Sequence, residues 1–535
     1  MKKTMKQHSF TSQLKSLALV FGIALAFASC ANEDVAQTPT NPNEDNDKNL
    51  TTFVAGDEAK TRTSLDYSSS DFFWEAGDYI YVKDDNNVLQ KSSNAPTQKV
   101  ASFKYKVPGK FTDHSSYEVY YLGKNSNATD KKVTISTAQT QTKPDNTEHF
   151  GESGDYGTAT AAGTLGGKSF SFTLEHQPAY LVFQPYTSNT ILQSCYLTKV
   201  EVTSDNDIAE TYTVNTSTGA LTGSAGSKQI VLTTSGSSSN PNGFPLTNSS
   251  ASRTTNGAYM VIKPGTHILK VRYWVKDVAT NVEGTITKTL PATAYTSNTY
   301  YDMTANLNVR DYDGDHYYMW DAQQQYWYGY EWTKHLSGNT GQPTLNGSGS
   351  SNYPQSNADP RYYNEYYPGY GVSNPATHTS CKDLPNANEM SWYCMYGDPR
   401  WDADELWTTM GHLYKGGMWF KKKSVLQVEN HYNTEKSADN TTDLRTAYMP
   451  YNNTNSSINS GVPSATDAGN YFYLPALGYC NTGQLNNVGN IGYYWSSSAY
   501  PLGSGLAFHL GFSSGNVYVD DYGRYNGFRV EPTFE

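Results

Sequence analysis

Two serine-containing stretches near the end of the chain carry residue types suited to nucleophilic catalysis. GFSSG at residues 511–515 matches the GxSxG pattern, and 491-IGYYWSSSAY-500 places three serines directly after aromatic residues. A GxSxG serine acts in a strand–turn–helix setting, with an acid and then a histidine later in the chain. The last histidine of this chain is His509, which precedes Ser513. We therefore predict that the protein is not an enzyme and that these hydroxyls bond to the backbone.

Two acidic stretches raise the question of a calcium site. 311-DYDGDH-316 begins like an EF-hand loop, but that loop needs Gly at position 6 and Glu at position 12, where this chain has His316 and Ala322. The acids of 401-WDADE-405 either join a calcium site built from loop oxygens or form a solvated turn. The sequence contains no HExxH, P-loop or GxGxxG motif. We expect no metal and no cofactor.

The N-terminus has the pattern of a secretory signal, in which basic residues precede an apolar run at residues 17–28 and then Ser29-Cys30. A run of this length is too short to span a bilayer as a helix. FASC resembles the lipobox of bacterial lipoproteins, although Phe27 stands where Leu is commonest. We predict a signal peptide at 1–29, lipidation of Cys30, an acidic flexible tether at 30–50, and an outer-membrane, cell-surface location. Ordinary cleavage near Ala28, leaving a free thiol, is the alternative.

The other four cysteines, Cys195, Cys381, Cys394 and Cys480, show no metal-binding spacing. The last three share one region, where they form either one disulfide bond or buried free thiols.

The composition indicates a secreted, strand-rich protein of several domains. The chain has 535 residues, 44 of them Tyr and 43 Gly, and only 17% are charged. The formal net charge is −11, and no basic cluster occurs, which excludes binding to nucleic acid through phosphates. We expect a mainly β protein.

Residues 51–310 consist of short alternating runs separated by Gly, Ser, Asn and Pro turns, which predicts β-sandwiches. In 269-LKVRYWV-275, for example, Leu269, Val271, Tyr273 and Val275 share one face. We expect Trp74 to be a core anchor, Gly77-Asp78 a turn, and His176 a hydrogen-bonded histidine at a strand end.

This segment resembles the fimbrillins, the subunits of type V pili. The resemblance is carried by 60-KTRTSLD-66, 72-FFWEAGDYIYV-82, 117-YEVYYLG-123, 173-TLEHQPAYLVF-183 and 259-YMVIKPG-265. It implies two tandem transthyretin-like β-sandwiches, at 51–190 and 191–310, and assembly by strand exchange. In that family a protease removes the first strand after a basic residue, and a partner's strand fills the groove. Residues 51–65 match this strand and its cleavage loop, with Arg62 as the processing site; otherwise Arg62 is simply an exposed basic residue.

Residues 311–535 form a separate, aromatic-rich domain, because they hold 27 of the 44 Tyr and 8 of the 10 Trp. Amphipathic aromatic residues suit recognition surfaces. Aromatic loops at 317–332 and 361–370 are the candidate ligand contacts: Tyr317, Tyr318, Trp327, Tyr328, Trp332, Tyr366 and Tyr367.

The sequence predicts several elements within this domain. Asn386 and Glu389 have the spacing of a capping box, followed by a helix that buries Met390, Tyr393 and Cys394. Residues 417–428 and 471–479 have the pattern of strands. Leu506–Phe512 and Val517–Val519 form a hairpin around a turn at Ser513–Asn516.

The domain resembles FISUMP-type domains, which are similar to C-type-lectin and formylglycine-generating-enzyme folds. The resemblance is carried by 381-CKDLPNANE-389, 411-GHLYKGGMWFKKKS-424, 474-LPALGY-479, 493-YYWSSS-498 and 524-RYNGFRV-530. It implies an α+β C-type-lectin-like fold. The EPN, QPD and WND motifs of lectin sugar sites are missing from the sequence. The paired catalytic cysteines of the formylglycine-generating enzyme are not recognisable either. The resemblance in fold therefore does not imply a sugar site or that catalytic site.

Together the two resemblances imply a pilus tip or adhesin subunit that binds other subunits by strand complementation and presents a C-terminal recognition domain to a surface glycan or protein. The alternative is a surface glycan-binding lipoprotein of a nutrient-uptake system.

Overall fold

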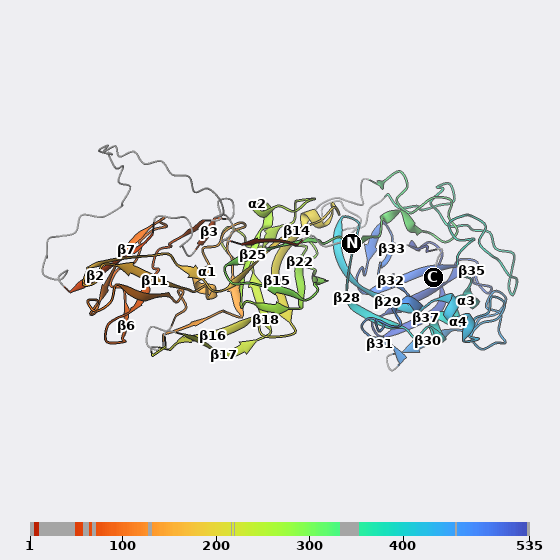
Figure 1. Ribbon diagram of the computed structural model, residues 1–535. Helices are drawn as coiled ribbons and strands as arrows, with labels where there is room; N and C mark the ends of the chain where they lie inside the picture. Colours follow the sequence, from red (N-terminus) through yellow and green to blue (C-terminus); the bar gives the residue numbers. More distant parts are fainter. Residues whose placement is uncertain are drawn as a thin grey trace, which may run out of the picture.

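The computed structural model describes residues 5–9, 49–56, 64–66, 71–126, 131–215, 217–218, 220–331, 352–454 and 457–531. Cys30, Arg62 and Trp332 lie outside these ranges. The chain is mainly β, as its composition predicts. Figure 1 shows three regions in a row, which we call the first, second and C-terminal regions.

The first region is a single sheet whose strand order is β6-β5-β8-β11-β12-β2-β7, with β13 paired to β11. Its strands are β2 (Leu50–Ala55), β5 (Ile80–Lys83), β6 (Leu89–Lys91), β7 (Phe103–Pro108), β8 (Ser116–Tyr121), β11 (Gly157–Gly163), β12 (Ser169–Phe172) and β13 (Glu175–His176). Ile80 of β5 and Tyr105 of β7 belong to one core, so the sheet curls around its apolar face. A short hairpin, β3 (Ser64–Asp66) and β4 (Asp71–Phe73), precedes β5.

Trp74 is fully buried in this core, with its ring edge-on to Tyr105 and Tyr121, which confirms it as a core anchor. Gly77 has φ +83, a left-handed conformation that suits the predicted turn. His176 is buried at a strand end, and its Nδ1 lies 3.1 Å from Asp155 Oδ1, as predicted.

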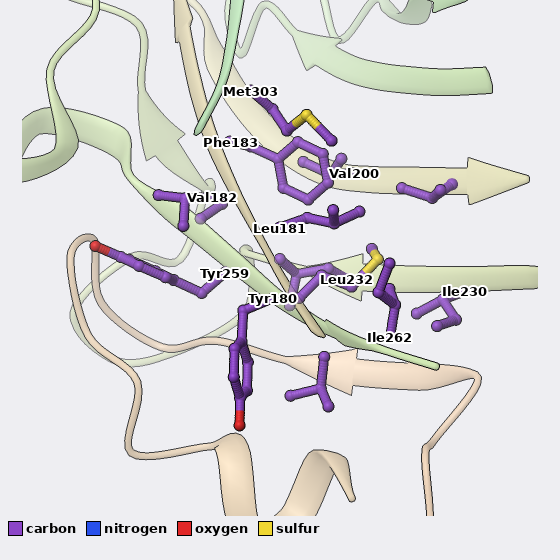
Figure 2. Close-up of a cluster of buried hydrophobic side chains, with 14 of the residues drawn as sticks. Tyr180, Leu181, Val182, Phe183, Val200, Ile230, Leu232, Tyr259, Ile262 and Met303 are labelled. Atoms are coloured by element: carbon purple, nitrogen blue, oxygen red, sulfur yellow. The ribbon is translucent and has the colours of Figure 1, made fainter. Parts of the chain in front are cut away.

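The second region packs two sheets face to face. One has the order β1-β25-β14-β20, and the other β10-β18-β15-β22-β23, with β19 paired to β15. The strands are β1 (Met5–Ser9), β14 (Ala179–Tyr186), β20 (Ala258–Ile262), β25 (Thr299–Asn306), β10 (Ala138–Thr140), β15 (Tyr196–Ser204), β18 (Gln229–Thr233), β19 (Phe244–Pro245), β22 (Leu269–Lys276) and β23 (Glu283–Thr289). Figure 2 shows the core between them, with Leu181 and Phe183 of β14 near Val200 and Leu232 of the other sheet. Alternate residues of β22 point into this core, as the sequence predicts.

Smaller elements complete the second region: β9 (Lys132–Thr134), β16 (Ala209–Val214), β17 (Leu221–Ser227), β21 (Gly265–His267), β24 (Thr293–Tyr295), α1 (Phe150–Ser153), η1 (Leu192–Ser194) and α2 (Arg253–Asn256). β9 pairs with β16 and β10 with β18. The sheets of the second region therefore contain strands from both sides of residue 190, where we expected the boundary between the first two regions. β9, β10 and β14 come before that residue in the chain.

The C-terminal region has two sheets, with orders β26-β28-β29-β32 (β31 paired to β28) and β27-β38-β35-β36-β37-β30. The strands are β26 (Arg310–Asp311), β28 (Arg400–Thr409), β29 (His412–Lys421), β31 (Asn459–Ser460), β32 (Tyr471–Pro475), β27 (Tyr317–Tyr318), β30 (Tyr451–Thr454), β35 (Ile491–Ala499), β36 (Leu506–Ser513), β37 (Asn516–Gly523) and β38 (Phe528–Arg529), with a separate hairpin of β33 (Tyr479–Asn481) and β34 (Gln484–Asn486). Two short 3-10 turns, η2 (Gly314–His316) and η5 (Ala468–Asn470), accompany them.

The predicted helix is α3 (Ala387–Tyr396), and its capping box is present: Asn386 accepts from the Glu389 amide, and Glu389 accepts from the Asn386 amide. Met390, Tyr393 and Cys394 are buried, as predicted. The hairpin β36–β37 is also confirmed. One prediction is partly wrong, because the strand β29 ends at Lys421 and Lys423–Val428 form a helix, α4, that buries Leu426.

The β28–β29 hairpin joins the C-terminal region to the second region. Leu406 and Leu413 of this hairpin belong to the core of the second region. Asp277, after β22, accepts hydrogen bonds from the Leu413 amide at 3.0 Å and from His412 Nδ1 at 3.1 Å. The Thr280 hydroxyl donates to the Leu413 carbonyl at 3.1 Å. Apolar and polar contacts thus fix the two regions to each other.

Candidate functional site

β2 occupies an interior position of the first sheet, between β12 on one side and β7 on the other. Its alternate residues Phe53 and Ala55 are fully buried, and the Phe53 ring stacks on Phe170 at a centroid distance of 5.4 Å. Removing β2 would therefore leave two rows of backbone N–H and C=O groups without partners, together with an apolar slot.

β1 lies at the edge of a sheet of the second region and pairs antiparallel with β25, from Met5↔Met303 to Ser9↔Thr299. Its residues fall within the predicted signal peptide. The other side of β25 pairs with β14, and most β25 side chains are buried on both faces. Without β1, this long and mostly buried strand becomes the edge of its sheet.

A hollow of about 700 Å³ lies beside the end of β2. Its lining includes Glu118, Thr158, Thr160, Thr173 and Glu175. No histidine or cysteine lines it among the described residues, so these side chains do not combine a nucleophile with a neighbouring imidazole base.

The aromatic residues predicted as ligand contacts divide into buried and exposed groups. Tyr317 and Trp327 are 0% and 2% exposed, so they pack in the core and offer no ring face to a ligand. The Tyr317 hydroxyl donates to the Leu477 carbonyl. Tyr318 and Tyr367 are half-buried, whereas Tyr328 is 50% and Tyr366 63% exposed.

Further exposed aromatic residues of the C-terminal region were not among the predicted ligand contacts. Tyr370 is 74%, Tyr525 54% and Tyr448 39% exposed. Tyr370 is the last residue of the predicted loop 361–370, whereas Tyr448 lies in a loop that the sequence did not single out.

The serines of both stretches make structural hydrogen bonds. The Ser496 hydroxyl donates to the Phe508 carbonyl at 2.8 Å, and Ser498 Oγ accepts from the Ala387 amide at the start of α3. Ser513 donates to Asn516 in the hairpin turn. Burial lowers the pKa of His509 to about 3, so this imidazole is a poor base.

The acidic stretches also have local partners. Asp402 Oδ1 accepts from the Asp404 and Glu405 amides, and Asp402 Oδ2 from Trp419 Nε1. Asp313 Oδ1 accepts from the Asp315 amide. The described residues bring no three His, Cys, Asp or Glu side chains together in a way that could hold a metal ion.

Cys195, Cys381, Cys394 and Cys480 are free and buried, so the C-terminal cysteines are thiols rather than a disulfide bond. Burial raises the pKa of Cys381 to about 12, which makes this thiol unreactive. None of the helices in the described part of the chain has the length and hydropathy needed to span a bilayer.

No family model matches the sequence, and no curated protein matches it either. Among solved structures, the chain is similar to a candidate cell adhesion protein from Bacteroides ovatus, with 13% identity, a TM-score of 0.30, and coverage of 48% of this chain and 92% of that one. It is also similar to the fimbrial anchor protein Mfa2 from Porphyromonas gingivalis, with 11% identity, a TM-score of 0.22, and coverage of 45% and 82%. A fimbrial protein from Bacteroides ovatus has 11% identity and a TM-score of 0.22, with coverage of 90% and 99%.

These neighbours are adhesion and fimbrial proteins rather than enzymes. At these identities and TM-scores the similarities do not assign the chain to a family.

Proposed function

We propose that this protein is a surface-anchored, fimbrillin-like lipoprotein that assembles by strand exchange and forms the tip of a pilus. The observation that carries the proposal is the position of β1 and β2. β1 lies within the predicted signal peptide and is lost when that peptide is removed before Cys30. β2 lies between Cys30 and Arg62, so one cut after Arg62 releases β2 from the first region.

The physical basis is that backbone N–H and C=O groups lose their hydrogen-bond partners. Release of β2 by the cut exposes the backbone edges of β7 and β12 and the slot of Phe53, and the earlier loss of β1 with the signal peptide exposes the edge of β25. Exposed edges of this kind bind an added strand, whose backbone supplies the hydrogen bonds and whose alternate side chains fill the slot.

The position of the last strand supports a tip role. β38 lies between β27 and β35 inside a sheet of the C-terminal region. β38 itself is therefore not free to be donated to another subunit, as expected of a subunit at the tip of a fibre.

The proposal includes three finer features. The first region, a single curled sheet, and the second, a sandwich of two sheets, are both transthyretin-like, and the C-terminal region is a FISUMP-type, C-type-lectin-like recognition domain. Lipidation of Cys30 holds the precursor at the outer membrane until processing.

The test is fibre entry of Arg62→Ala in the native cell. This variant should stay at the cell surface at its precursor length and be missing from sheared fibres. Lys60→Ala, two residues away, is the matched control and should enter fibres normally. Normal fibre entry of R62A would contradict processing at Arg62.

A glycan-binding surface lipoprotein is the second candidate, favoured by the exposed rings of Tyr328 and Tyr366. Such a protein would remain monomeric and be retarded by soluble polysaccharide in a native gel.

A further inference from the structure

Four tyrosines from three separate loops meet on one face of the C-terminal region. The rings of Tyr367 and Tyr370 are 6.2 Å apart, and those of Tyr448 and Tyr500 are 5.4 Å apart. The Tyr367 hydroxyl donates to the Pro501 carbonyl at 2.8 Å, which joins the first pair to the loop of the second. Tyr370 and Tyr448 are exposed, whereas Tyr367 and Tyr500 are half-buried supports.

Two adjacent carboxylates, Asp520 and Asp521 of β37, border these rings. The Tyr448 hydroxyl donates to Asp520 Oδ1 at 3.0 Å. Asp521 pairs with Phe508 of β36, whose ring centroid lies 5.6 Å from that of Tyr500. Both carboxylates are half-buried. We call these six residues the tyrosine surface.

The two acids lack a basic partner within the part of the chain that the structure describes, because no Lys, Arg or His there forms an ion pair with either. Burial and the neighbouring Asp520 raise the pKa of Asp521, so its charge is unfavourable in the free protein. A cation held between the two carboxylates would relieve that repulsion, whereas a neutral ligand would not.

The tyrosine rings and the apolar side chains beside them also favour a cationic ligand. Tyrosine faces attract ammonium and guanidinium groups through the ring quadrupole. Val372, Leu502 and Met449 beside the tyrosines are 48%, 40% and 38% exposed, and apolar atoms of this kind pack against the aliphatic stems of Lys and Arg. An inorganic cation would use the carboxylates alone and leave the rings and apolar atoms without a role.

We propose that the tyrosine surface binds a Lys- or Arg-bearing segment of another protein, with its cations over Tyr370 and Tyr448 and paired with Asp520 and Asp521. This inference rests on the proposed recognition role of the C-terminal region, but it does not depend on strand exchange.

The test uses the full chain in detergent and two fluorescein-labelled peptides, one of alternating Arg and Ser and one of alternating Glu and Ser. Fluorescence anisotropy at physiological salt should show binding of the Arg peptide only. Asp520→Asn/Asp521→Asn should weaken it about tenfold or more, because two charge-assisted contacts are lost. Tyr370→Ala, which removes a mostly exposed ring, should weaken it roughly threefold.

Asp383→Asn/Asp404→Asn removes two exposed acids elsewhere and changes the net charge equally, so it should leave binding within about twofold. Equal losses in both double variants would show non-specific attraction and overturn the proposal. Binding of soluble dextran at the same tyrosines, without binding of the Arg peptide, would overturn it in favour of a glycan surface. Fibre entry of D520N/D521N should be normal, so that failure of this inference and failure of the pilus proposal give different results.

Discussion

Arg524 is a fully buried cation that fastens a surface loop to the core. Its Nε donates to the Leu506 carbonyl at 2.8 Å, and its Nη1 to the carbonyls of Asn364 and Tyr366 at 3.1 and 3.3 Å. The guanidinium lies 4.4 Å from the Trp320 ring centroid. Burial lowers the pKa of Arg524 to about 10. These contacts position the loop that carries Tyr367 and Tyr370.

Arg524→Lys should destabilise the protein by about 1–3 kcal/mol, because an ammonium lacks the planar fork that reaches three carbonyls. Urea unfolding measures the change. Arg310→Lys alters an exposed arginine and should shift the free energy of unfolding by less than about 0.5 kcal/mol. Equal effects of the two variants would contradict the role given to Arg524.

Residue types alone predicted what several side chains do. Trp74, His176 and the serines of β35 have the structural roles that their local patterns indicate. The sequence could not separate buried Tyr317 from exposed Tyr366, because both lie in aromatic-rich loops and burial there depends on distant segments such as Leu477. The choice between a disulfide bond and free thiols likewise needed the fold.

Among the elements, α3 was predictable because its start signal is local. Asn386→Ala should destabilise the C-terminal region by about 1 kcal/mol through loss of the cap. Asn386→Ser keeps a side-chain acceptor and should recover more than half of that loss. Thermal unfolding followed by circular dichroism measures both; equal destabilisation by Ala and Ser would mean that the cap contributes little.

The α4 helix was not predictable from its own residues. Val425 and Val428 favour a strand, and Leu426 is the one buried side chain of this helix. Its docking is a tertiary effect. The same reason applies to the tyrosine surface, whose tyrosines come from three loops and whose two acids come from β37, and to the pairing of β1 with β25.

At the scale of the whole molecule, Asp277 holds the second and C-terminal regions together. Burial alone would raise its pKa, but hydrogen bonds from His412 and from the Leu413 and Ala279 amides outweigh burial, so the pKa lies below its usual value. A lowered pKa means that the ionised carboxylate stabilises the folded state. This contribution is complete above the unfolded pKa of about 4 and is lost as the pH falls through the folded pKa.

Asp277→Asn should therefore destabilise the full chain by about 1–3 kcal/mol at neutral pH, and the difference from wild type should shrink below a pH of about 4. Calorimetry across this pH range measures it. Asp383→Asn, an exposed acid away from the joint, should show no such difference. A D277N effect that is constant with pH would contradict the contribution of the charge.

The central claim is that a cut after Arg62, in a protein that has already lost β1 with its signal peptide, removes β2 and opens the first region to a partner's strand. N-terminal sequencing of the subunit recovered from sheared fibres tests this claim most directly. A single new N-terminus at Thr63 is expected. Fibre subunits that still begin at Cys30, or that retain residues 50–55, would contradict it.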